Sequence, residues 1–415
     1  MANSPKNILF ISYDGMTDPL GQSQVIPYLQ GLSKHRFNIF LLSCEKTAAF
    51  SKNKGLVEEL LKGYSIQWIP LSYTKNPPAL STWFDIKKLK NAAAQIHREH
   101  GIDLVHTRPG VPALVGLWLK KKFGMKFLND IREFYADSRV EGGMWKLKNP
   151  VFKKIYDYFK RKEAEGVEQS DGIVCLTWTA EKIIRQWPEY QQGTPLAVIP
   201  CSVDLNLFDP LMSDENKTAE IKRELNIGES DIVVTYLGSI GGWYLIEEMM
   251  HFCKLLSDKK STAKFLFISP HRHEAIVAAA TTYGVDPSKV ITKKASRPEV
   301  PQLLALSDYS VFFIRPCYSK LSSSPTKHGE IMAMGIPLIT NSGVGDVKDI
   351  VQRHHSGVVL NDFTEASFAM AVDRIVSGES FDREGIRLGA EACYSLETAV
   401  EDYSKMYMKI LEIVV

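Results

Sequence analysis

Residues 322–346 read SSSPTKHGEIMAMGIPLITNSGVGD and indicate an α/β fold with an anion site. Ser324 and Pro325 are typical of a helix start, because proline lacks the N–H that the first helical turn leaves unpaired. Lys327 and Glu330 follow at a spacing that places them on one face of this helix. An apolar strand and a glycine-rich loop come next. Because a helix N-terminus beside a lysine attracts negative charge, the stretch predicts a helix–strand unit that binds an anion.

The residue types in this stretch favour a ligand that carries both phosphate and hydroxyl groups. Backbone N–H groups near Ser324 and Thr326, together with the Lys327 ammonium, would hold phosphate. Ionised Glu330 only accepts hydrogen bonds, as it would from the paired hydroxyls of a polyol such as ribose. A nucleotide-sugar is the simplest molecule that offers both groups. The alternative is an ordinary helix start with a solvated Lys327 that pairs with an exposed Glu330.

Apolar strand runs alternate with helical patterns along almost the whole chain. The expected strands cover 7–13, 38–43, 66–70, 104–107, 127–131, 172–176, 197–200, 231–237, 265–269, 290–292, 309–314, 337–340 and 357–360. Continuous apolar strands separated by helices predict α/β architecture with parallel, doubly wound sheets covered on both faces. The polar segment 204–226 interrupts the alternation, so we expect a first domain over 1–203 and a second domain over 204–395. The amphipathic pattern of 396–415 predicts a helix that packs back on the first domain.

The bulk composition is that of a globular protein and excludes several classes. The chain has 415 residues, of which 45% are hydrophobic, and its formal net charge of +2 points to no particular partner. No apolar run reaches about 18 residues, and the start of the chain has no signal-peptide pattern. The six cysteines are scattered without a CxxC pair, which favours a reducing cytoplasm over a disulfide framework or a zinc site. No motif for nucleic-acid recognition is present.

Three segments carry a family resemblance. Residues 14–24 (DGMTDPLGQSQ) look like a strand-to-helix loop, and residues 198–208 (VIPCSVDLNLF) are similar to an interdomain signature. Residues 329–337 (GEIMAMGIP) match the second half of an E-x7-E motif. With these segments in view, nearly the whole chain resembles the bacterial family 4 glycosyltransferases. These enzymes have the GT-B architecture, in which two Rossmann-like domains face a central cleft.

The resemblance implies a hexosyltransferase-type glycosyltransferase. Such an enzyme moves a sugar from a nucleotide-diphosphate sugar to an acceptor hydroxyl, with retention of the anomeric configuration and without metal or cofactor. The sequence contains no Asp-x-Asp pair, which agrees with this scheme. Many relatives glycosylate lipid-linked acceptors, so the expected acceptor is a glycan or a lipid-linked molecule in the synthesis of cell-surface polysaccharide or glycolipid.

The chain departs from the family pattern at two places. The first glutamate of E-x7-E would fall on Ser322, and the glycine-rich loop 238–244 (GSIGGWY) lacks the usual arginine and lysine. The charge of a pyrophosphate would therefore be met by Arg315, Lys320 and Lys327, which cluster in the sequence near the helix start. The donor-site candidates are Gly21, Gln22, Gly238, Ser239, Gly241, Arg315, Lys320, Ser324, Thr326, Lys327 and Glu330.

Polar residues also follow the predicted strands of the first domain, at the edge where ligands of α/β proteins gather. His106 and Arg108 end one strand, and the resemblance implies a histidine near the donor sugar that either residue could match. The candidate catalytic residues are His106, Arg108 and Lys327, and the acceptor-side candidates are Asp14, Asp18, Asp130 and Arg132. Structural ion pairs and simple turn residues are the alternative interpretation.

Residues 145–162 (WKLKNPVFKKIYDYFKRK) interleave basic and aromatic side chains. This composition is typical of a helix that lies on an anionic membrane surface. We therefore expect a cytoplasmic protein that is peripheral on the inner face of the membrane. The alternative is a solvated helix whose aromatic side chains pack inward.

Two other functions could use the same architecture. A nucleotide-sugar 2-epimerase would need acidic groups around the sugar, and Ser322 leaves the site poorer in acid. A non-catalytic GT-B subunit would have no reason to keep Lys327 and Glu330. An NAD-dependent dehydrogenase is disfavoured because no GxGxxG follows the first strand.

Overall fold

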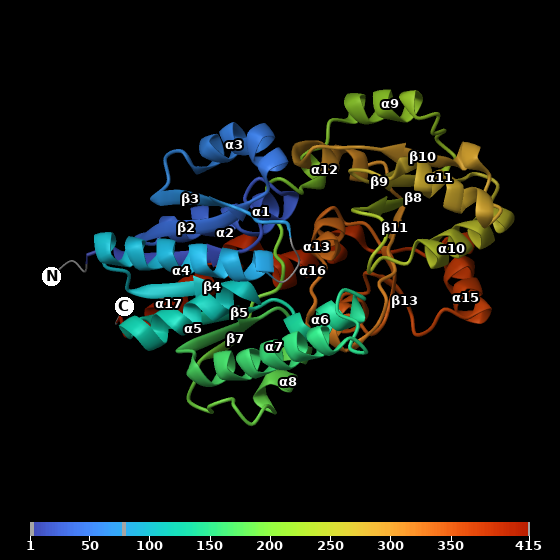
Figure 1. Cartoon of the computed structure of the whole chain (residues 1–415). Helices are drawn as coiled ribbons and strands as arrows, with labels where there is room; N and C mark the ends of the chain where they lie inside the picture. The colour runs from blue at the N-terminus through green and yellow to red at the C-terminus, as the bar shows by residue number, and fades with distance from the viewer. Residues whose placement is uncertain (1–3, 77–79, 414–415) are drawn as a thin grey trace. The chain divides into compact units, whose positions relative to one another are not determined.

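The computed structural model describes residues 4–76 and 80–413, which form two compact units (Figure 1). One unit combines Met1–Pro200 with Leu396–Val415, and the other is Cys201–Ser395. The helix expected at the end of the chain is α17 (Leu396–Ile410), and residues 414–415 of that expected range lie outside the described residues.

The first unit is built on a seven-stranded parallel sheet with the order β3-β2-β1-β4-β5-β6-β7. Ile8 of β1 pairs with Ile39 on one side and with Leu104 on the other, so the strand order reverses beside β1. In such a sheet the ligand crevice lies at the carboxyl ends of the strands where the order reverses, here β1 and β4. The strands are β1 (Lys6–Ser12), β2 (Phe37–Glu45), β3 (Ile66–Ser72), β4 (Leu104–Thr107), β5 (Lys126–Ile131), β6 (Gly172–Cys175) and β7 (Leu196–Val198).

Helices cover both faces of this sheet, because successive side chains of each buried strand point to opposite sides. Ile8 joins the apolar cluster that contains Tyr403 and Tyr407 of α17, whereas Leu9 joins a cluster that contains Val115 of α5. The helices are α1 (Pro19–Gln24), α2 (Ile26–Ser33), α3 (Thr47–Leu61), α4 (Leu80–His100), α5 (Val111–Phe123), α6 (Tyr135–Glu141), α7 (Pro150–Gln169), α8 (Trp178–Arg185) and α17.

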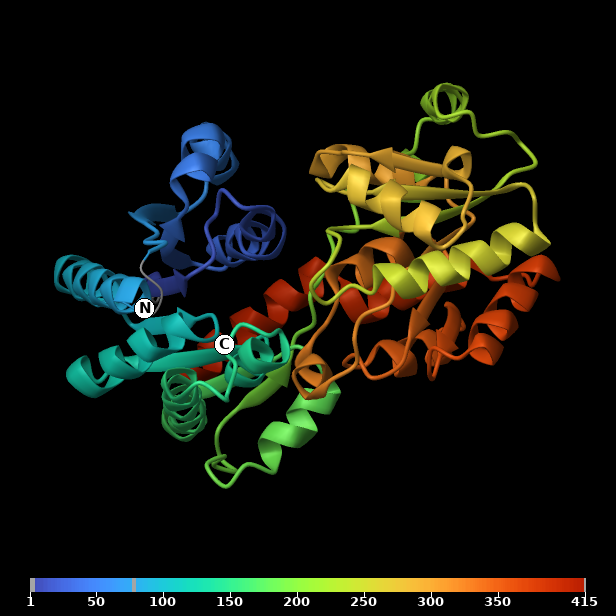
Figure 2. The same cartoon turned by 45° about the vertical axis from the view of Figure 1, so that its right-hand side comes forward.

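The second unit repeats the same principle with a six-stranded parallel sheet, in the order β10-β9-β8-β11-β12-β13. The order reverses between β8 and β11, which again marks a ligand edge. Helices lie on both faces of the sheet (Figure 2). The strands are β8 (Ile232–Leu237), β9 (Ala263–Ile268), β10 (Val290–Lys293), β11 (Tyr309–Val311), β12 (Leu338–Asn341) and β13 (Gly357–Leu360). The α-helices are α9 (Glu215–Glu224), α10 (Ile246–Lys259), α11 (His273–Thr282), α12 (Val300–Leu304), α13 (Thr326–Ala333), α14 (Val347–Arg353), α15 (Glu365–Val376) and α16 (Arg383–Tyr394).

Local sequence signals explain several of the helix ends. The side chain of Asn149 accepts a hydrogen bond from the Val151 N–H, with Pro150 at the first position of α7. The helix expected after Ser324 begins one residue later than the sequence pattern suggests. Pro325 has an extended ψ of 117° and therefore caps α13 from outside.

Two doubly wound parallel sheets confirm the fold class that the strand and helix pattern predicts.

Candidate functional site

Lys327 lies on α13 with its ammonium enclosed by aromatic rings. Nζ lies 3.8 Å from the ring centre of Tyr244 and 4.2 Å from that of Tyr236, and it donates a hydrogen bond of 3.1 Å to the Tyr236 hydroxyl. The residue is 6% exposed, and burial lowers the pKa of its ammonium to about 7, although nearby Glu330 acts in the opposite direction. In the described part of the chain no carboxylate forms an ion pair with Lys327. Its charge is therefore available to an anion that enters from the strand edge.

The backbone of the glycine-rich loop lies directly against this ammonium. Gly238 follows β8 with a φ of +121°, and a Cβ at this position would come within 2.8 Å of Lys327 Nζ. The Ser239 carbonyl accepts a hydrogen bond of 2.6 Å from the Tyr236 hydroxyl. Because β8 and β11 flank the point where the strand order reverses, this loop and Lys327 occupy the expected ligand edge of the second sheet.

Arg315 and Lys320, which are also predicted donor-site cations, lie against the ring of Trp243 in the glycine-rich loop. Arg315 Cζ lies 4.9 Å and Lys320 Nζ lies 3.9 Å from the ring centre of Trp243. The Arg315 N–H also donates to the Trp243 carbonyl at 2.9 Å. Trp243 and Tyr244 are neighbours in the chain, so the structure gathers all three predicted cations around two adjacent aromatic residues.

Glu330 is held by an arginine that the sequence pattern did not single out as its partner. Arg297 Nη1 donates to Glu330 Oε1 at 2.7 Å, and the guanidinium lies 5.2 Å from the ring centre of Phe208. Oε2 of Glu330 has no hydrogen-bond donor among the residues that the structure describes. The carboxylate is thus oriented and retains one oxygen that can accept from a ligand hydroxyl.

Other donor-site candidates of the second unit form hydrogen bonds with the backbone or begin a helix. Ser324 Oγ accepts a hydrogen bond of 3.2 Å from the Cys201 N–H, and Thr326 is the first residue of α13. Ser322, at the position where the resemblance implies a glutamate, is buried and donates to the Ser319 carbonyl at 2.8 Å. It therefore closes the short 3-10 helix Tyr318–Ser322.

Arg272 is a further cation at the glycine-rich loop that sequence reasoning missed. It follows β9, and its Nη1 donates to the Ile240 carbonyl at 3.4 Å. A Cβ on Gly241 would lie 2.7 Å from the same nitrogen. The sequence could have indicated Arg272 only by its position after a strand of the second sheet, and many surface residues have such a position.

In the first unit, three of the predicted residues form a buried network with α17. His106 Nε2 lies 3.3 Å from Asp130 Oδ2, and its Nδ1 lies 2.6 Å from the Tyr407 hydroxyl. Tyr403 donates to the same Asp130 oxygen at 2.9 Å, and Arg132 Nη1 lies 3.4 Å from it. This network ties the last helix to the carboxyl ends of β4 and β5.

Burial and charge set the protonation states in this network. Burial lowers the pKa of His106, so the ring is neutral at pH 7, accepts from Tyr407 and donates from Nε2 to Asp130. Burial alone would raise the pKa of Asp130, but Arg132 and His106 outweigh it and lower that pKa to about 2. The contacts among His106, Asp130 and Arg132 are those expected if these residues form structural ion pairs, which is the alternative interpretation of the sequence. A catalytic role of His106 and an acceptor role of Asp130 and Arg132 stay predictions.

The other first-unit candidates lie around the loop that follows β1. Arg108 is 7% exposed, donates to the Gln24 carbonyl at 3.3 Å and lies 3.8 Å from the Asp14 carboxylate. Asp18 pairs with Lys46 at 2.7 Å. The Gln22 side chain donates to the Thr17 carbonyl at 3.4 Å.

This loop owes its shape to Gly21 and to a buried carboxylate. A Cβ on Gly21 would lie 2.4 Å from the Gly15 carbonyl oxygen, so no larger residue fits. Glu45, at the end of β2, accepts from the Met16 N–H at 2.7 Å and from the Thr17 hydroxyl at 2.6 Å. The sequence pattern did not assign this positioning function to Glu45.

The segment 145–162 has its aromatic side chains turned mainly inward. Trp145 and Phe159 pack with ring centres 5.4 Å apart, and Tyr156 donates to Asp137 at 2.9 Å. Met144, immediately before the segment, and Val151 within it are 50% and 59% exposed. None of the helices described here combines the length and apolar character that a bilayer crossing requires.

Comparison with known proteins agrees with this architecture. Residues 217–389 match the family model of glycosyl transferases group 1. A protein of Bacillus subtilis (strain 168) described as "Putative glycosyltransferase YtcC" is 22% identical over 275 residues, which span 62% of this chain and 66% of that protein. The chain thus matches just under two thirds of the length of this relative.

Solved structures extend the likeness to the whole chain. Sucrose-phosphate synthase from Thermosynechococcus elongatus superposes with a TM-score of 0.75 at 16% identity, covering 99% of this chain and 100% of that one. Anabaena HepE in complex with UDP-glucose gives a TM-score of 0.68 at 12% identity, covering 97% of this chain and 99% of that one. The fold is therefore GT-B, with two Rossmann-like parallel-sheet units.

Proposed function

We propose that this chain is a family 4 glycosyltransferase that transfers a hexose from a nucleotide-diphosphate sugar to an acceptor hydroxyl. The observation that carries the proposal is the Lys327 ammonium, buried between Tyr236 and Tyr244 beside Gly238. Holding a cation there without an ion-pair partner costs solvation free energy, which an incoming diphosphate recovers. The group 1 family match and the UDP-glucose complex of HepE support a nucleotide-sugar as the donor.

In this proposal the second unit stabilises the departing nucleotide. Lys327, with Arg315 and Lys320 on Trp243, neutralises the negative charge that grows on the diphosphate as the bond to the sugar breaks. Glu330, oriented by Arg297, accepts from the ribose hydroxyls. The leaving phosphate itself takes the acceptor proton, so the scheme needs neither a side-chain base nor a metal. The sugar is transferred with retention of configuration.

The proposed setting is the synthesis of cell-surface polysaccharide or glycolipid, on the inner face of the membrane. The support is a surface at the start of α7, which we call the α7 patch and define as Met144, Lys146, Leu147, Lys148, Val151, Lys153 and Lys154, all exposed. Exposed apolar side chains among lysines are suited to anionic lipid headgroups.

A thermal-shift panel tests the donor site. The purified chain is heated with UDP, GDP, ADP, CMP or dTDP, each with and without its common sugars. One nucleotide should stabilise the protein, by about 2.7 kcal/mol at a hundredfold excess over its dissociation constant. Glu330→Ala should abolish the shift, whereas Glu384→Ala, an exposed carboxylate on α16 of the same unit, should keep it. A folded protein that no nucleotide stabilises would refute the proposal and favour a non-catalytic subunit.

A further inference from the structure

Cations lie against two glycines of the loop that follows β8. A Cβ on Gly238 would come within 2.8 Å of Lys327 Nζ, and a Cβ on Gly241 would come within 2.7 Å of Arg272 Nη1. Both glycines have a positive φ, of +121° and +87°. Each nitrogen lies so close to the backbone that only glycine leaves room for it, so the loop gathers two positive charges at the ligand edge of the second sheet.

Arg272 reaches this loop from the neighbouring strand. It follows β9, which pairs with β8 in parallel, so the segments after the two strands lie at the same edge of the sheet. Its φ of +65° is a left-handed conformation that costs an arginine free energy. Two local contacts hold the segment: the Ser269 hydroxyl donates to the His271 carbonyl at 3.0 Å, and His273 Nε2 donates to the Ser269 carbonyl at 2.8 Å. Backbone strain that is held in this way gathers at functional sites.

The Arg272 guanidinium has unused hydrogen-bonding capacity. Within the described residues it forms one hydrogen bond, from Nη1 to the Ile240 carbonyl at 3.4 Å. None of the carboxylates in the described chain forms an ion pair with it, and the residue is exposed. A guanidinium carries five N–H donors in a planar fork that matches the oxygens of a phosphate. Most of these donors are therefore available to a ligand.

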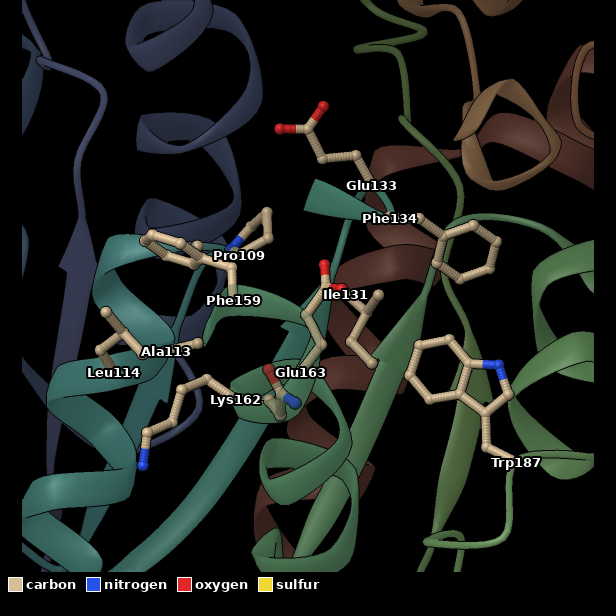
Figure 3. A pocket seen from close by; sticks show the side chains of 12 residues that line it. Pro109, Ala113, Leu114, Ile131, Glu133, Phe134, Phe159, Lys162, Glu163 and Trp187 are labelled. Atoms are coloured by element: carbon tan, nitrogen blue, oxygen red, sulfur yellow. The ribbon is translucent and has the colours of Figure 1, made fainter. Parts of the chain in front are cut away.

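The first unit also contains a pocket, but its lining does not suit a phosphate group (Figure 3). The lining is mainly apolar and includes two carboxylates, Glu133 and Glu163, which would repel an anion. Lys162, the one cation among the described lining residues, pairs with Glu165 at 2.5 Å. Of these two places in the described chain, the glycine-rich loop is the one that offers a cation without a carboxylate partner.

We propose that Arg272 binds the diphosphate of the donor and supplies the guanidinium that the glycine-rich loop lacks. The loop 238–244 itself contains neither arginine nor lysine. Arg272 provides positive charge beside Gly241, as Lys327 does beside Gly238. The two cations share the negative charge that grows on the departing diphosphate as its bond to the sugar breaks. This inference rests on the proposed glycosyl transfer and adds a donor-binding residue to it.

Isothermal titration calorimetry tests the role of Arg272 with two probes, inorganic pyrophosphate and the nucleoside diphosphate that the thermal-shift panel identifies. Arg272→Gln should weaken binding of both by roughly 10- to 100-fold, the usual contribution of a charged hydrogen bond. Arg272→Lys keeps the charge but loses the planar fork, so its affinity should lie between those of the wild type and Arg272→Gln. The matched control is Arg353→Gln, which should bind like the wild type. Arg353 is an exposed arginine that ends α14, close to the start of β13 at the opposite edge of the sheet.

The two probes separate failure of this inference from failure of the proposed function. Equal affinity of the wild type and Arg272→Gln, or equal weakening in Arg272→Gln and Arg353→Gln, would overturn the role of Arg272. A wild-type chain that binds neither pyrophosphate nor any nucleotide would overturn this role together with the proposed function. Pyrophosphate binding that requires Arg272, in a chain that no nucleotide stabilises, would retain Arg272 as a diphosphate-binding residue and refute the nucleotide-sugar donor.

Gly241→Ala decides the question if Arg272→Gln does not fold. Its Cβ would displace the Arg272 guanidinium, whereas Gly242→Ala strains the loop at a φ of +67° with nothing within 4 Å of its Cβ. Weaker pyrophosphate binding by Gly241→Ala alone would support the role of Arg272. Equal binding by the two alanine variants would exclude it.

Discussion

At the residue scale, Lys327 combines burial, aromatic contacts and the lack of an ion-pair partner in the described chain. Replacement by methionine keeps the length of the side chain and suits the aromatic surroundings, so the fold should persist. Loss of the ammonium should weaken binding of the nucleotide diphosphate by roughly 10- to 100-fold, the usual contribution of a charged hydrogen bond. Isothermal titration of Lys327→Met against Lys348→Met, a lysine of α14, checks this. Equal affinities in the two variants would exclude Lys327 from the phosphate site.

The same residue predicts a pH dependence of donor binding. The pKa of Lys327 is lowered to about 7 by burial, and a bound diphosphate should raise it. Below pH 7 the ammonium is charged before and after binding, so no proton is taken up. As the pH rises above 7, binding must take up a proton, and affinity should fall by up to tenfold per pH unit.

Calorimetry in two buffers with different ionisation enthalpies measures this proton uptake. Tyr236 and Tyr244 also face the ammonium, but burial raises the pKa of both hydroxyls, so they stay neutral in this range. Glu330 is the one carboxylate nearby that affects the pKa of Lys327 in the described chain. Lys327→Met should lose the proton uptake at pH 8, and uptake that persists there would assign it to another group.

Gly238 provides a third test at the same scale. Gly238→Ala would strain the backbone at a φ of +121° and place Cβ 2.8 Å from Lys327 Nζ. Gly242→Ala would strain a φ of +67° with nothing within 4 Å of its Cβ. Both variants should lose about 1–3 kcal/mol of folding stability, measured by urea unfolding, but Gly238→Ala alone should weaken nucleotide binding. A similar loss of binding in both variants would mean that loop strain, and not the displaced ammonium, is responsible.

At the scale of elements, α17 depends on polar contacts as well as on apolar packing. Tyr407→Phe removes the hydroxyl that donates to His106 Nδ1 and leaves a buried acceptor unpaired. This should cost about 1–3 kcal/mol in the free energy of unfolding, measured with urea. Tyr158→Phe, a 41% exposed tyrosine of α7, should change stability by less than about 0.5 kcal/mol. If Tyr407→Phe is as stable as the wild type, the His106 network does not hold α17 in place.

At the scale of the whole molecule, the α7 patch predicts salt-dependent attachment to anionic vesicles. Each lysine near such a surface contributes about 1 kcal/mol, so Lys148→Ala with Lys154→Ala should weaken binding by roughly 30-fold. Sedimentation with phosphatidylglycerol vesicles, compared with phosphatidylcholine vesicles, measures this. Lys217→Ala with Lys222→Ala, on α9 of the second unit, is the control pair. Binding that does not depend on salt or on these lysines would exclude the α7 patch as a membrane contact.

Much of the architecture follows from local pattern. Each expected strand range overlaps a strand of one of the two sheets, because a buried parallel strand must be apolar on both faces. Arg315, Lys320 and Lys327 are predicted as phosphate-binding cations because they cluster in the sequence near the helix start, while the glycine-rich loop lacks the usual arginine and lysine. The glycine-rich loop is predicted as a phosphate site from its glycines together with its position after the first strand of the second domain.

The tertiary structure decided which of these groups are partners. The alternative interpretation of the sequence pairs Lys327 with Glu330 because the two lie on one helix face, yet Arg297 holds the carboxylate. His106 and Tyr407 are 301 positions apart, and only the packing of α17 on the first sheet joins them. Arg315 and Lys320 both pack on the ring of Trp243, and no sequence pattern predicted this contact. Periodicity reports the burial of one residue at a time, whereas ion pairs and pockets depend on the order in which strands and helices are assembled. For that reason the sequence alone determined two doubly wound sheets and only predicted a ligand site among the cations, whereas the tertiary structure alone determined that Arg297 is the partner of Glu330.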